Sequence, residues 1–247
     1  MRSRPHPDWI APDWPVNRRV RSLITTRDGG VSSGKFASLN LSLRVGDDPR
    51  CVARNRAILR ACLPAEPAWV TQVHGTGVVD AGRATPDAEA DGVVTRIPGE
   101  VCAVMTADCV PVLLSDRAGC SVGIAHAGWR GLAGGIVENV VRAMGVPPRD
   151  IIAYIGPGIG ARRYEVGEDV RGAFVGTDPD AAKSFAPGEN GTYFADLYDL
   201  ARRRLAAAGV AGVYGGGFCT ASEGRFFSYR RDRTTGRMAS LVWLEDS

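Results

Sequence analysis

The stretch VCAVMTADCVPVLLSDRAGCSVGIAHAGWRG, residues 101–131, contains three largely apolar runs in close succession. The runs are Val101–Met105, Val110–Leu114 and Cys120–Ala125, and short connections separate them. Apolar runs of this length with turn residues between them are typical of strands. Because no helix-like stretch lies between them, they predict mixed or antiparallel pairing. We therefore expect an α+β fold rather than a doubly wound parallel sheet.

Similar apolar runs on both sides of this stretch predict further strands, since valine and isoleucine are frequent in them and turn residues bound them. These runs are Arg21–Thr25, Ala68–Val73, Asp91–Thr95, Ile151–Ile155, Val210–Tyr214, Phe226–Tyr229 and Met238–Leu244.

Helix-like stretches lie between the strands, at Pro49–Cys62, Leu132–Met144, Glu168–Val175 and Ala195–Ala208. The first follows Asp48 as its N-cap and has proline at its first position, which is a typical helix start. In the last stretch Arg204 falls within the apolar stripe, so its side chain must snorkel to solvent or find a partner.

The composition is that of a globular protein. With 45% hydrophobic and 23% charged residues, the 247-residue chain is neither disordered nor fibrous. A chain of this length buries a core without disulfides or a structural metal, so any bound metal is expected to serve chemistry. No linker or repeat divides the sequence, and we expect one catalytic domain over residues 1–247, with residues 1–19 as a loose N-terminal segment.

The charge balance argues against two kinds of partner. The net charge is only +3, from 30 basic and 27 acidic residues, which is too even to indicate nucleic-acid binding. No segment approaches the ~18 continuous apolar residues of a membrane span, and no apolar stretch follows the first arginines. We expect a cytoplasmic protein that binds neither nucleic acid nor a membrane.

The six cysteines show no C-x-x-C pair and no regular spacing, so they do not indicate a disulfide framework. We expect reduced thiols, most of them buried as small apolar groups.

His74, Cys109 and His126 each lie at the end of an apolar run, beside glycine or another turn-forming residue. A thiolate and two imidazoles suit zinc, and three protein ligands leave a fourth position open for chemistry. Two other interpretations stay open. The three side chains can be ordinary core or surface groups, or Cys109 can be a nucleophile with a histidine as its base. Metal analysis separates the nucleophile from the zinc site, because a thiolate–imidazole pair needs no zinc.

Arg27, Arg44 and Arg130 lie close to glycines, where the backbone can approach a ligand. Arg130 also precedes the helix expected from Leu132, so an anion could meet both its guanidinium and the helix N-terminus. The plain alternative for each is a solvated arginine in a turn.

Two further segments have residue types that are found in ligand-binding sites. Phe226–Asp232 combines aromatic and charged side chains that could hold a purine ring, although aromatic strand residues are more often core. Gly156–Gly160 lacks the pattern of a triphosphate-binding loop, and no G-x-S-x-G motif indicates a serine triad.

Two motifs are more specific than any of these spacings: Ala107-Asp108-Cys109-Val110-Pro111-Val112-Leu113 and His126-Ala127-Gly128-Trp129-Arg130-Gly131. They occur in order with Thr26–Ser32, Ser38–Leu41, Val70–Gly75, Ile155–Gly160, Tyr164–Gly167, Phe227–Asp232 and Thr235–Ser240. From Thr25 to Leu244 the chain strongly resembles the YfiH family, the bacterial purine nucleoside phosphorylase family that is also called laccase-domain or polyphenol oxidase proteins.

The resemblance implies a layered α/β/β/α sandwich with mixed sheets, and a zinc ion held by His74, Cys109 and His126. It implies phosphorolysis of adenosine, inosine, guanosine and methylthioadenosine, together with hydrolytic deamination of adenosine. The implied partners are purine nucleosides and phosphate, with Arg27, Arg44 and Arg130 as the candidate phosphate-binding residues. Copper is the alternative metal, from the older naming of the family.

The implied chemistry makes Cys109, Asp108 and Arg44 the candidate catalytic residues. Asp108 is the carboxylate closest in sequence to the metal ligands. Two roles stay open for it: it moves protons while a metal-bound water attacks the purine, or it only orients the turn. Arginine would position phosphate. Many family members have histidine in the segment Leu43–Asp47, where this chain has Arg44, so both phosphate binding and acid–base work stay open there. Cys219 receives no catalytic role.

The predicted function is a zinc-dependent purine nucleoside phosphorylase with adenosine deaminase activity, as a monomer or small homo-oligomer. The alternatives are a peptidoglycan-precursor editing hydrolase on the same site, a copper-dependent polyphenol oxidase and a non-catalytic metal-binding module. Three histidines in the whole chain argue against a multicopper centre.

Overall fold

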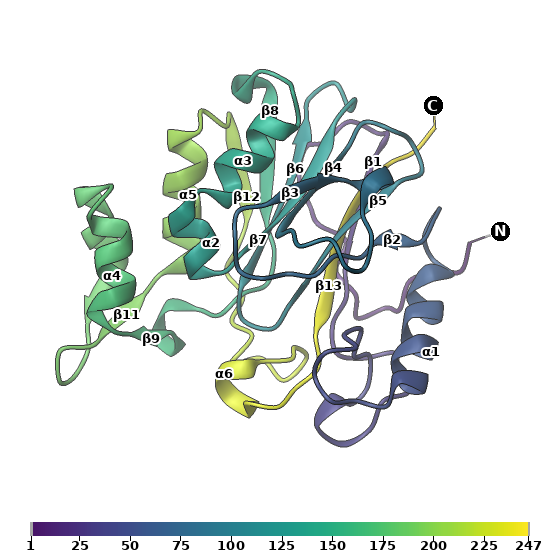
Figure 1. Ribbon diagram of the computed structural model, residues 1–247, viewed down its shortest axis with the longest axis horizontal. Coiled ribbons are helices and arrows are strands. Elements are labelled where there is room, and N and C mark those ends of the chain that lie inside the picture. Colours follow the sequence, from purple (N-terminus) through teal and green to yellow (C-terminus); the bar gives the residue numbers. More distant parts are fainter. Residues whose placement is uncertain (1, 247) are drawn as a thin grey trace.

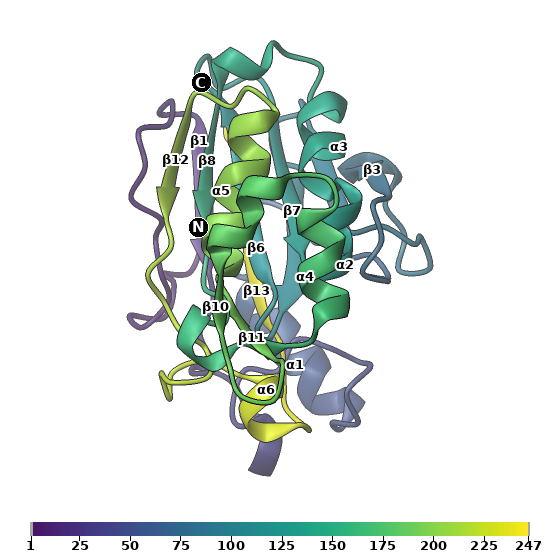
Figure 2. The same ribbon diagram turned by 90° about the vertical axis from the view of Figure 1, so that its left-hand side faces the viewer.

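Two β-sheets lie face to face in the computed structural model, which describes residues 2–246, and helices cover the outer face of each sheet (Figures 1 and 2). The larger sheet has six strands in the order β12-β8-β6-β7-β4-β3. Its strands are β3 (Val78–Asp80), β4 (Gly92–Thr95), β6 (Val110–Asp116), β7 (Val122–Ala127), β8 (Ile151–Ile155) and β12 (Gly212–Gly215). The β3/β4 and β8/β12 pairs are parallel and the others antiparallel, so the sheet is mixed.

The smaller of the two facing sheets has the order β1-β13-β5-β2. Its strands are β1 (Val20–Ile24), β2 (Pro67–Ala68), β5 (Val101–Thr106) and β13 (Met238–Leu244). A third, small antiparallel sheet of β9 (Glu165–Val166), β10 (Phe185–Pro187) and β11 (Tyr193–Ala195) accompanies α4 (Glu168–Val175) at one end of the molecule (Figure 1). These sheets confirm the predicted α+β class with mixed pairing.

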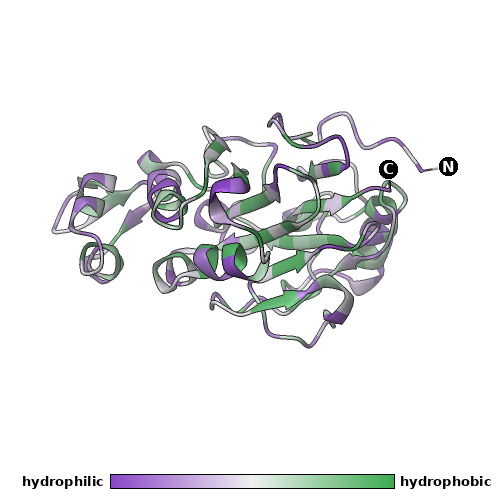
Figure 3. Ribbon diagram, turned by 90° about the horizontal axis from the view of Figure 1, so that it is seen from above, coloured by the Kyte–Doolittle hydropathy of each residue, from purple (hydrophilic) through white to green (hydrophobic). Residues whose placement is uncertain are grey.

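Three apolar cores hold the four layers together. On one side, α2 (Trp129–Gly134), α3 (Ile136–Ala143) and α5 (Leu197–Ala207) cover the six-stranded sheet. The second core lies between the two sheets, and the third lies between the four-stranded sheet and α1 (Pro49–Arg60). Figure 3 shows the hydrophobic strands in the interior and hydrophilic residues on the outer helices. The layers are therefore those of an α/β/β/α sandwich.

Strand β13 shows how the sequence pattern builds these layers. Ala239, Leu241 and Trp243 belong to the core under α1, whereas Val242 and Leu244 belong to the core between the sheets. Successive side chains of a strand point to opposite faces, so a strand that is apolar at nearly every position can serve two cores at once.

Two of the strand predictions are wrong. The run Ala68–Val73 contributes only β2 to a sheet, because the backbone N–H groups of Val73, His74 and Gly75 bind the carboxylate of Asp91 instead of a neighbouring strand. The run Phe226–Tyr229 forms no strand: Phe226 and Phe227 are fully buried beside β13, and Tyr229 starts the short helix α6 (Tyr229–Asp232).

The helix expected at Leu132–Met144 is two helices, α2 and α3, which meet at Gly135 with φ +99°. A left-handed residue ends a helix, and glycine adopts that conformation without a side-chain clash. The other expected helices are confirmed with small shifts at their ends, and Asp48 caps α1 by accepting a hydrogen bond from Arg50 N. Arg204 finds the partner that its position requires, since its Nε lies 2.7 Å from Glu138 Oε1.

Residues 2–19 lie against the body of the protein. Trp9 and Trp14 are each only 7% exposed, and Ile10 pairs with Ile24. Most side chains of residues 2–8 are exposed, and the looseness of the segment stays a prediction. The single domain over residues 1–247 stays a prediction.

All six cysteines are free, as expected, but only Cys102 is buried, so the expectation that most of them are buried is wrong. Within residues 2–246, no helix is both long enough and apolar enough to cross a membrane. Five single-turn or short 3-10 helices complete the chain, at Gly34–Phe36, Ala81–Arg83, Pro148–Asp150, Ala161–Arg163 and Pro179–Ser184.

Candidate metal centre and substrate cavity

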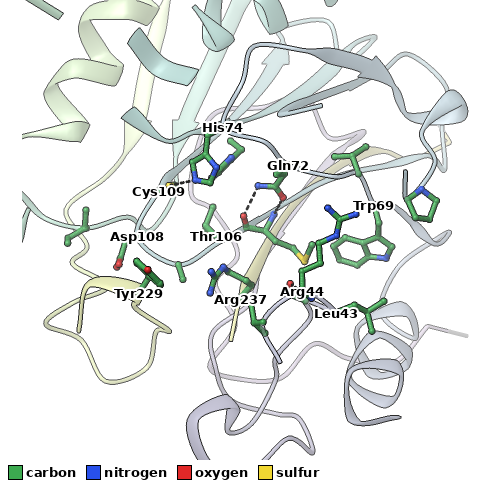
Figure 4. Close-up of a pocket in the computed structure, with 18 of the residues that line it drawn as sticks. Leu43, Arg44, Trp69, Gln72, His74, Thr106, Asp108, Cys109, Tyr229 and Arg237 are labelled. Carbon is green, nitrogen blue, oxygen red and sulfur yellow. Dashed lines mark hydrogen bonds between the residues drawn. The ribbon is translucent and has the colours of Figure 1, made fainter. Parts of the chain in front are cut away.

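The fold brings together the three side chains that the sequence nominated as metal ligands. One ligand atom each of His74, Cys109 and His126 lies within 4.8 Å of the other two (Figure 4). The distance from Cys109 Sγ to His74 Nε2 is 3.9 Å. In a tetrahedral zinc site the bond lengths place a thiolate sulfur and an imidazole nitrogen about 3.6 Å apart. The donor set and its spacing therefore fit a zinc ion with one coordination position left open.

Cys109 owes its position to a crossing between the two sheets. The chain leaves β5 in the four-stranded sheet and enters β6 in the six-stranded sheet, and Ala107, Asp108 and Cys109 make the connection. His126 lies on β7, where it pairs with Pro111 of β6. Hairpin pairing of β6 and β7 thus fixes the thiol and one imidazole at the same end of the sheet.

The backbone is strained at this crossing and at one of the histidine ligands. Asp108 has φ +95° and His74 has φ +60°, both in the left-handed region that side chains rarely adopt. Such residues persist where surrounding contacts hold them, and they are frequent at functional sites. Gly128 lies opposite: a Cβ there would come within 3.0 Å of both Cys109 Sγ and His74 Cδ2. A side chain at position 128 would therefore force these two ligand side chains to shift by a few tenths of an ångström.

Asp91, which the sequence analysis placed in a strand and gave no role, holds two of the three candidate ligands. Its fully buried carboxylate lies 2.7 Å from His126 Nδ1 and accepts the backbone N–H groups of Val73, His74 and Gly75. The hydrogen bond to Nδ1 directs the other ring nitrogen of His126, Nε2, toward the cluster. Burial acts to raise the pKa of Asp91, but the bonds from His126, Gly75 and Val73 outweigh it and lower the pKa, so the group is a carboxylate at neutral pH.

The thiol and the imidazole of the cluster form an ion pair when no metal is bound. Burial alone would raise the pKa of Cys109, but the charges and hydrogen bonds of His126 and His74 lower it to about 6. Burial alone would lower the pKa of His126, but the Cys109 thiolate and Asp91 raise it to about 9. At neutral pH Cys109 is thus already the thiolate that a metal needs.

We predict that Cys109 of the metal-free protein reacts with iodoacetamide with an apparent pKa of about 6. Below that pH the thiol keeps its proton and reacts slowly, and above it the reactive thiolate predominates, whereas an ordinary thiol changes near pH 8.5. Alkylation at residue 109, followed by mass spectrometry from pH 4 to 10, measures the transition. A Cys109→Ala variant should lack it, and a midpoint near the ordinary value would contradict the ion pair.

Asp108 has a different position from the one expected of a proton-moving group. Its Oδ1 accepts from Thr220 Oγ1 at 2.6 Å and its Oδ2 accepts from Arg230 N at 2.6 Å. Both carboxylate oxygens therefore accept hydrogen bonds from the protein, and these bonds connect α6 and Thr220 to the sheet crossing. Of the two roles that the sequence left open for Asp108, these bonds favour the positioning role, and its acid–base role stays a prediction.

The cluster lies in a cavity of about 630 Å³ that reaches from His74 and Cys109 to Trp69 and Leu43 (Figure 4). Four arginines line this cavity: Arg44, Arg56, Arg230 and Arg237. Two carboxylates line it, Asp87 and the fully engaged Asp108. A cavity with this excess of positive charge favours an anionic ligand or an anionic part of a ligand.

Of the three predicted phosphate-binding arginines, only Arg44 is among the described residues that line the cavity. Its Nη2 donates to Thr71 Oγ1 at 2.6 Å. Arg27 instead donates to Ala37 O and lies over the Phe227 ring. Arg130 lies with its guanidinium 4.3 Å from the Trp129 ring centroid. Neither Arg27 nor Arg130 is among the described residues that line this cavity, and their phosphate binding stays a prediction.

Arg56 and Arg237 were not predicted as site residues from the sequence, and Arg230 was named only as part of the segment Phe226–Asp232. Within that segment Tyr229 and Arg230 line the cavity, while Phe226 and Phe227 are core. The motif Thr235–Ser240 was noted as part of the family resemblance, and this was the available indication for Arg237. Gln72 also lines the cavity, but its amide is bound to both backbone groups of Met105.

Comparison with known proteins places this site in a family. The model of a family described as multi-copper polyphenol oxidoreductase laccase matches residues 21–245. A purine nucleoside phosphorylase of Pseudomonas aeruginosa is 51% identical over 240 residues, covering 96% of this chain and 99% of that protein. The purine nucleoside phosphorylase YfiH of Escherichia coli K12 is 48% identical over 239 residues, covering 95% and 98%.

Solved structures support the same family assignment. A Neisseria meningitidis protein, NMB0706, superposes with a TM-score of 0.94 at 51% identity, covering 97% of this chain and 100% of that one. YlmD from Geobacillus stearothermophilus superposes with a TM-score of 0.89 at 34% identity, covering 99% and 98%. The double-sheet sandwich with a His–Cys–His cluster at its sheet crossing is thus that of a laccase-domain protein. The chain belongs to the YfiH family.

Proposed function

We propose that this protein is a zinc-dependent purine nucleoside phosphorylase. The observation that carries the proposal is the juxtaposition, in one cavity, of the His74–Cys109–His126 cluster with four arginines. The names of the relatives support the same activity. A neutral nucleoside needs no cationic cavity, whereas a phosphate co-substrate does.

Phosphorolysis joins a phosphate oxygen to C1′ of the sugar while the C1′–N9 bond breaks. The purine leaves with the electron pair of that bond and takes up a proton. The main task of the protein is to hold phosphate and nucleoside in line, and effective orientation of two reactants contributes several kcal/mol, about 7 or more in favourable cases. Arginine forks supply this positioning and stabilise the charge that moves in the transition state.

His74, Cys109 and His126 would hold the zinc ion, and Asp91 would keep His126 in the ligating orientation. Bound there, zinc would supply Lewis-acid activation of a water or of a substrate atom. This capacity also supports the adenosine deaminase activity that we include in the proposal. Since both oxygens of Asp108 are engaged, the exposed Asp87 at the cavity is the remaining carboxylate that could exchange protons there.

The copper oxidase alternative finds less support in the site. The cluster supplies two imidazoles and one thiolate, and the chain has a single further histidine, His6, whose ring packs near Trp9. A multicopper centre needs many more imidazoles than this. We therefore propose zinc as the metal and nucleosides as the substrates.

Incubation of the zinc-loaded protein with adenosine or inosine tests the proposal. We expect free purine base and ribose 1-phosphate only when phosphate is present, and inosine from adenosine without phosphate. Removal of zinc with a chelator should abolish both products, and added zinc should restore them. If neither free base nor inosine appears with zinc fully loaded, the proposal fails. Turnover of a muramyl-amino-acid nucleotide under the same conditions would favour the cell-wall alternative.

A further inference from the structure

Arg237 stands out among the cavity residues because its backbone and half of its guanidinium are fixed. It directly precedes β13, and its backbone N–H donates to Asn40 Oδ1 at 3.0 Å, where Asn40 is fully buried. Its Nη1 donates to the carbonyl oxygens of Thr235 and Gly236, each at 3.0 Å. These bonds set the direction of the side chain before any ligand arrives, which lowers the entropy cost of binding.

The remaining donors of Arg237 face the cavity. Its hydrogen bonds to the described residues use Nη1 alone, so Nε and Nη2 are left over. In Figure 4 its nitrogens point between Thr106 and Tyr229, two other residues that line the cavity. Two adjacent N–H groups of a guanidinium match two oxygens of a tetrahedral oxyanion.

Arg237 also lacks an anionic partner in the part of the chain that the structure describes. Seven other arginines form ion pairs with carboxylates, and none of the four cavity arginines is among them. Burial lowers the pKa of Arg237, and the negative charges of Cys109 and Asp108 act in the opposite direction. Partial burial of a cation without a paired anion costs free energy, which a bound anion would recover.

Two of the other cavity arginines lie against aromatic rings. Arg56 donates Nε to Leu41 O and stacks 4.6 Å from the Trp69 ring centroid. Arg230 donates Nη1 to Glu165 O and lies 5.0 Å from the Tyr164 ring centroid. Arg237 has no such ring contact among the described residues, so its two free donors are the best arranged for an external ligand.

We infer that Arg237 is the principal anchor for inorganic phosphate in this cavity. The inference rests on the proposed function, and it goes beyond it by naming a binding residue outside the set Arg27, Arg44 and Arg130. Arg44, which lines the same cavity and extends toward Trp69 in Figure 4, is a secondary contact. Arg237 has to bind phosphate through two parallel hydrogen bonds from its guanidinium, so lysine cannot replace it fully.

Calorimetric titration with inorganic phosphate compares the wild-type protein with Arg237→Gln. We expect phosphate affinity to fall about 10- to 100-fold, since two charge-assisted hydrogen bonds are lost. The phosphate affinity of Arg237→Lys should lie between those of the wild-type protein and Arg237→Gln. The matched control is Arg142→Gln, because Arg142 is exposed on α3 and bonds only Asn139. Zinc content and melting temperature of each variant show whether the protein stays folded.

A second measurement needs no substitution. Phenylglyoxal modifies accessible arginines, and inorganic phosphate should slow its reaction at Arg237 but not at Arg142. Unchanged phosphate affinity in Arg237→Gln overturns the inference, as does failure of phosphate to protect Arg237, or failure of the wild-type protein to bind phosphate. If Arg237→Gln does not fold, the protection experiment alone decides.

Two outcomes separate this inference from the proposed function. If phosphate binding depends on Arg237 but no nucleoside is cleaved, the phosphate site stands and the proposed function fails. If nucleosides are phosphorolysed with an unchanged KM for phosphate in Arg237→Gln, the function stands and the inference fails. Adenosine 5′-monophosphate distinguishes the source of the oxyanion. Should it displace both phosphate and bound nucleoside through Arg237, the assignment to free phosphate is overturned.

Discussion

Cys109→Ser is expected to purify with less than about a tenth of the zinc of the wild-type protein, and to lose the phosphorolysis and deamination that we propose. The thiolate is the only anionic donor in the cluster, and its lowered pKa makes it available at neutral pH. A serine hydroxyl keeps its proton at that pH and is a poor zinc ligand. Elemental analysis of the purified variant and chromatography of its reaction products measure the two losses.

Cys219→Ser is the matched control for this change. Cys219 also has a lowered pKa and accepts a hydrogen bond from Gly160 N, but it lies outside both the His74–Cys109–His126 cluster and the described residues that line the cavity. Its variant should keep full zinc content. A Cys109→Ser protein that retains its zinc and loses activity would contradict the ligand assignment. That result would instead favour Cys109 as a nucleophile, the interpretation that the sequence left open.

Asp91→Asn is expected to lower the free energy of unfolding by about 3 kcal/mol, because it breaks a buried charged pair with His126. Zinc affinity should fall about 10- to 100-fold, as is usual when the hydrogen-bond partner of a ligating histidine is lost. The asparagine keeps the volume, but its amide NH₂ would face the backbone N–H groups of residues 73–75. Urea denaturation and competition with a chelator measure the two effects.

Asp116→Asn separates the metal effect from general destabilisation. Asp116 is also buried and accepts two backbone N–H groups, from Cys120 and Ser121, at the far end of the β6–β7 hairpin. The Asp116→Asn variant should have a lower free energy of unfolding and an unchanged zinc affinity. Equal zinc affinities in Asp91→Asn and the wild-type protein would show that Asp91 stabilises the fold without positioning His126.

Much of the fold follows from local pattern. Ile151–Ile155 and Met238–Leu244 are strands with the predicted bounds, and Glu168–Val175 is the predicted helix. The two failed strand predictions have a common cause, which is a tertiary contact that replaces the local pairing. The run ending at Val73 leaves the sheet for the carboxylate of Asp91, and Phe226 and Phe227 fill a core without entering a strand.

The sequence by itself determined which side chains could serve as ligands. The scarcity of histidine and the family motifs pointed to His74, Cys109 and His126, and the structure places these three together. Their chemistry is a property of the residue types, so it is already present in the sequence.

Only the tertiary structure decided what surrounds those ligands. Asp91 lies 35 residues from His126 in sequence and Asp108 lies 122 residues from Arg230, and each carboxylate meets its partner because strand pairing and the sheet crossing bring distant segments together. Arg237 lines the cavity, whereas Arg27 and Arg130 are not among the described residues that line it. Local periodicity specifies the face of each strand, whereas the position of a charge in a cavity depends on the register between strands far apart in the chain.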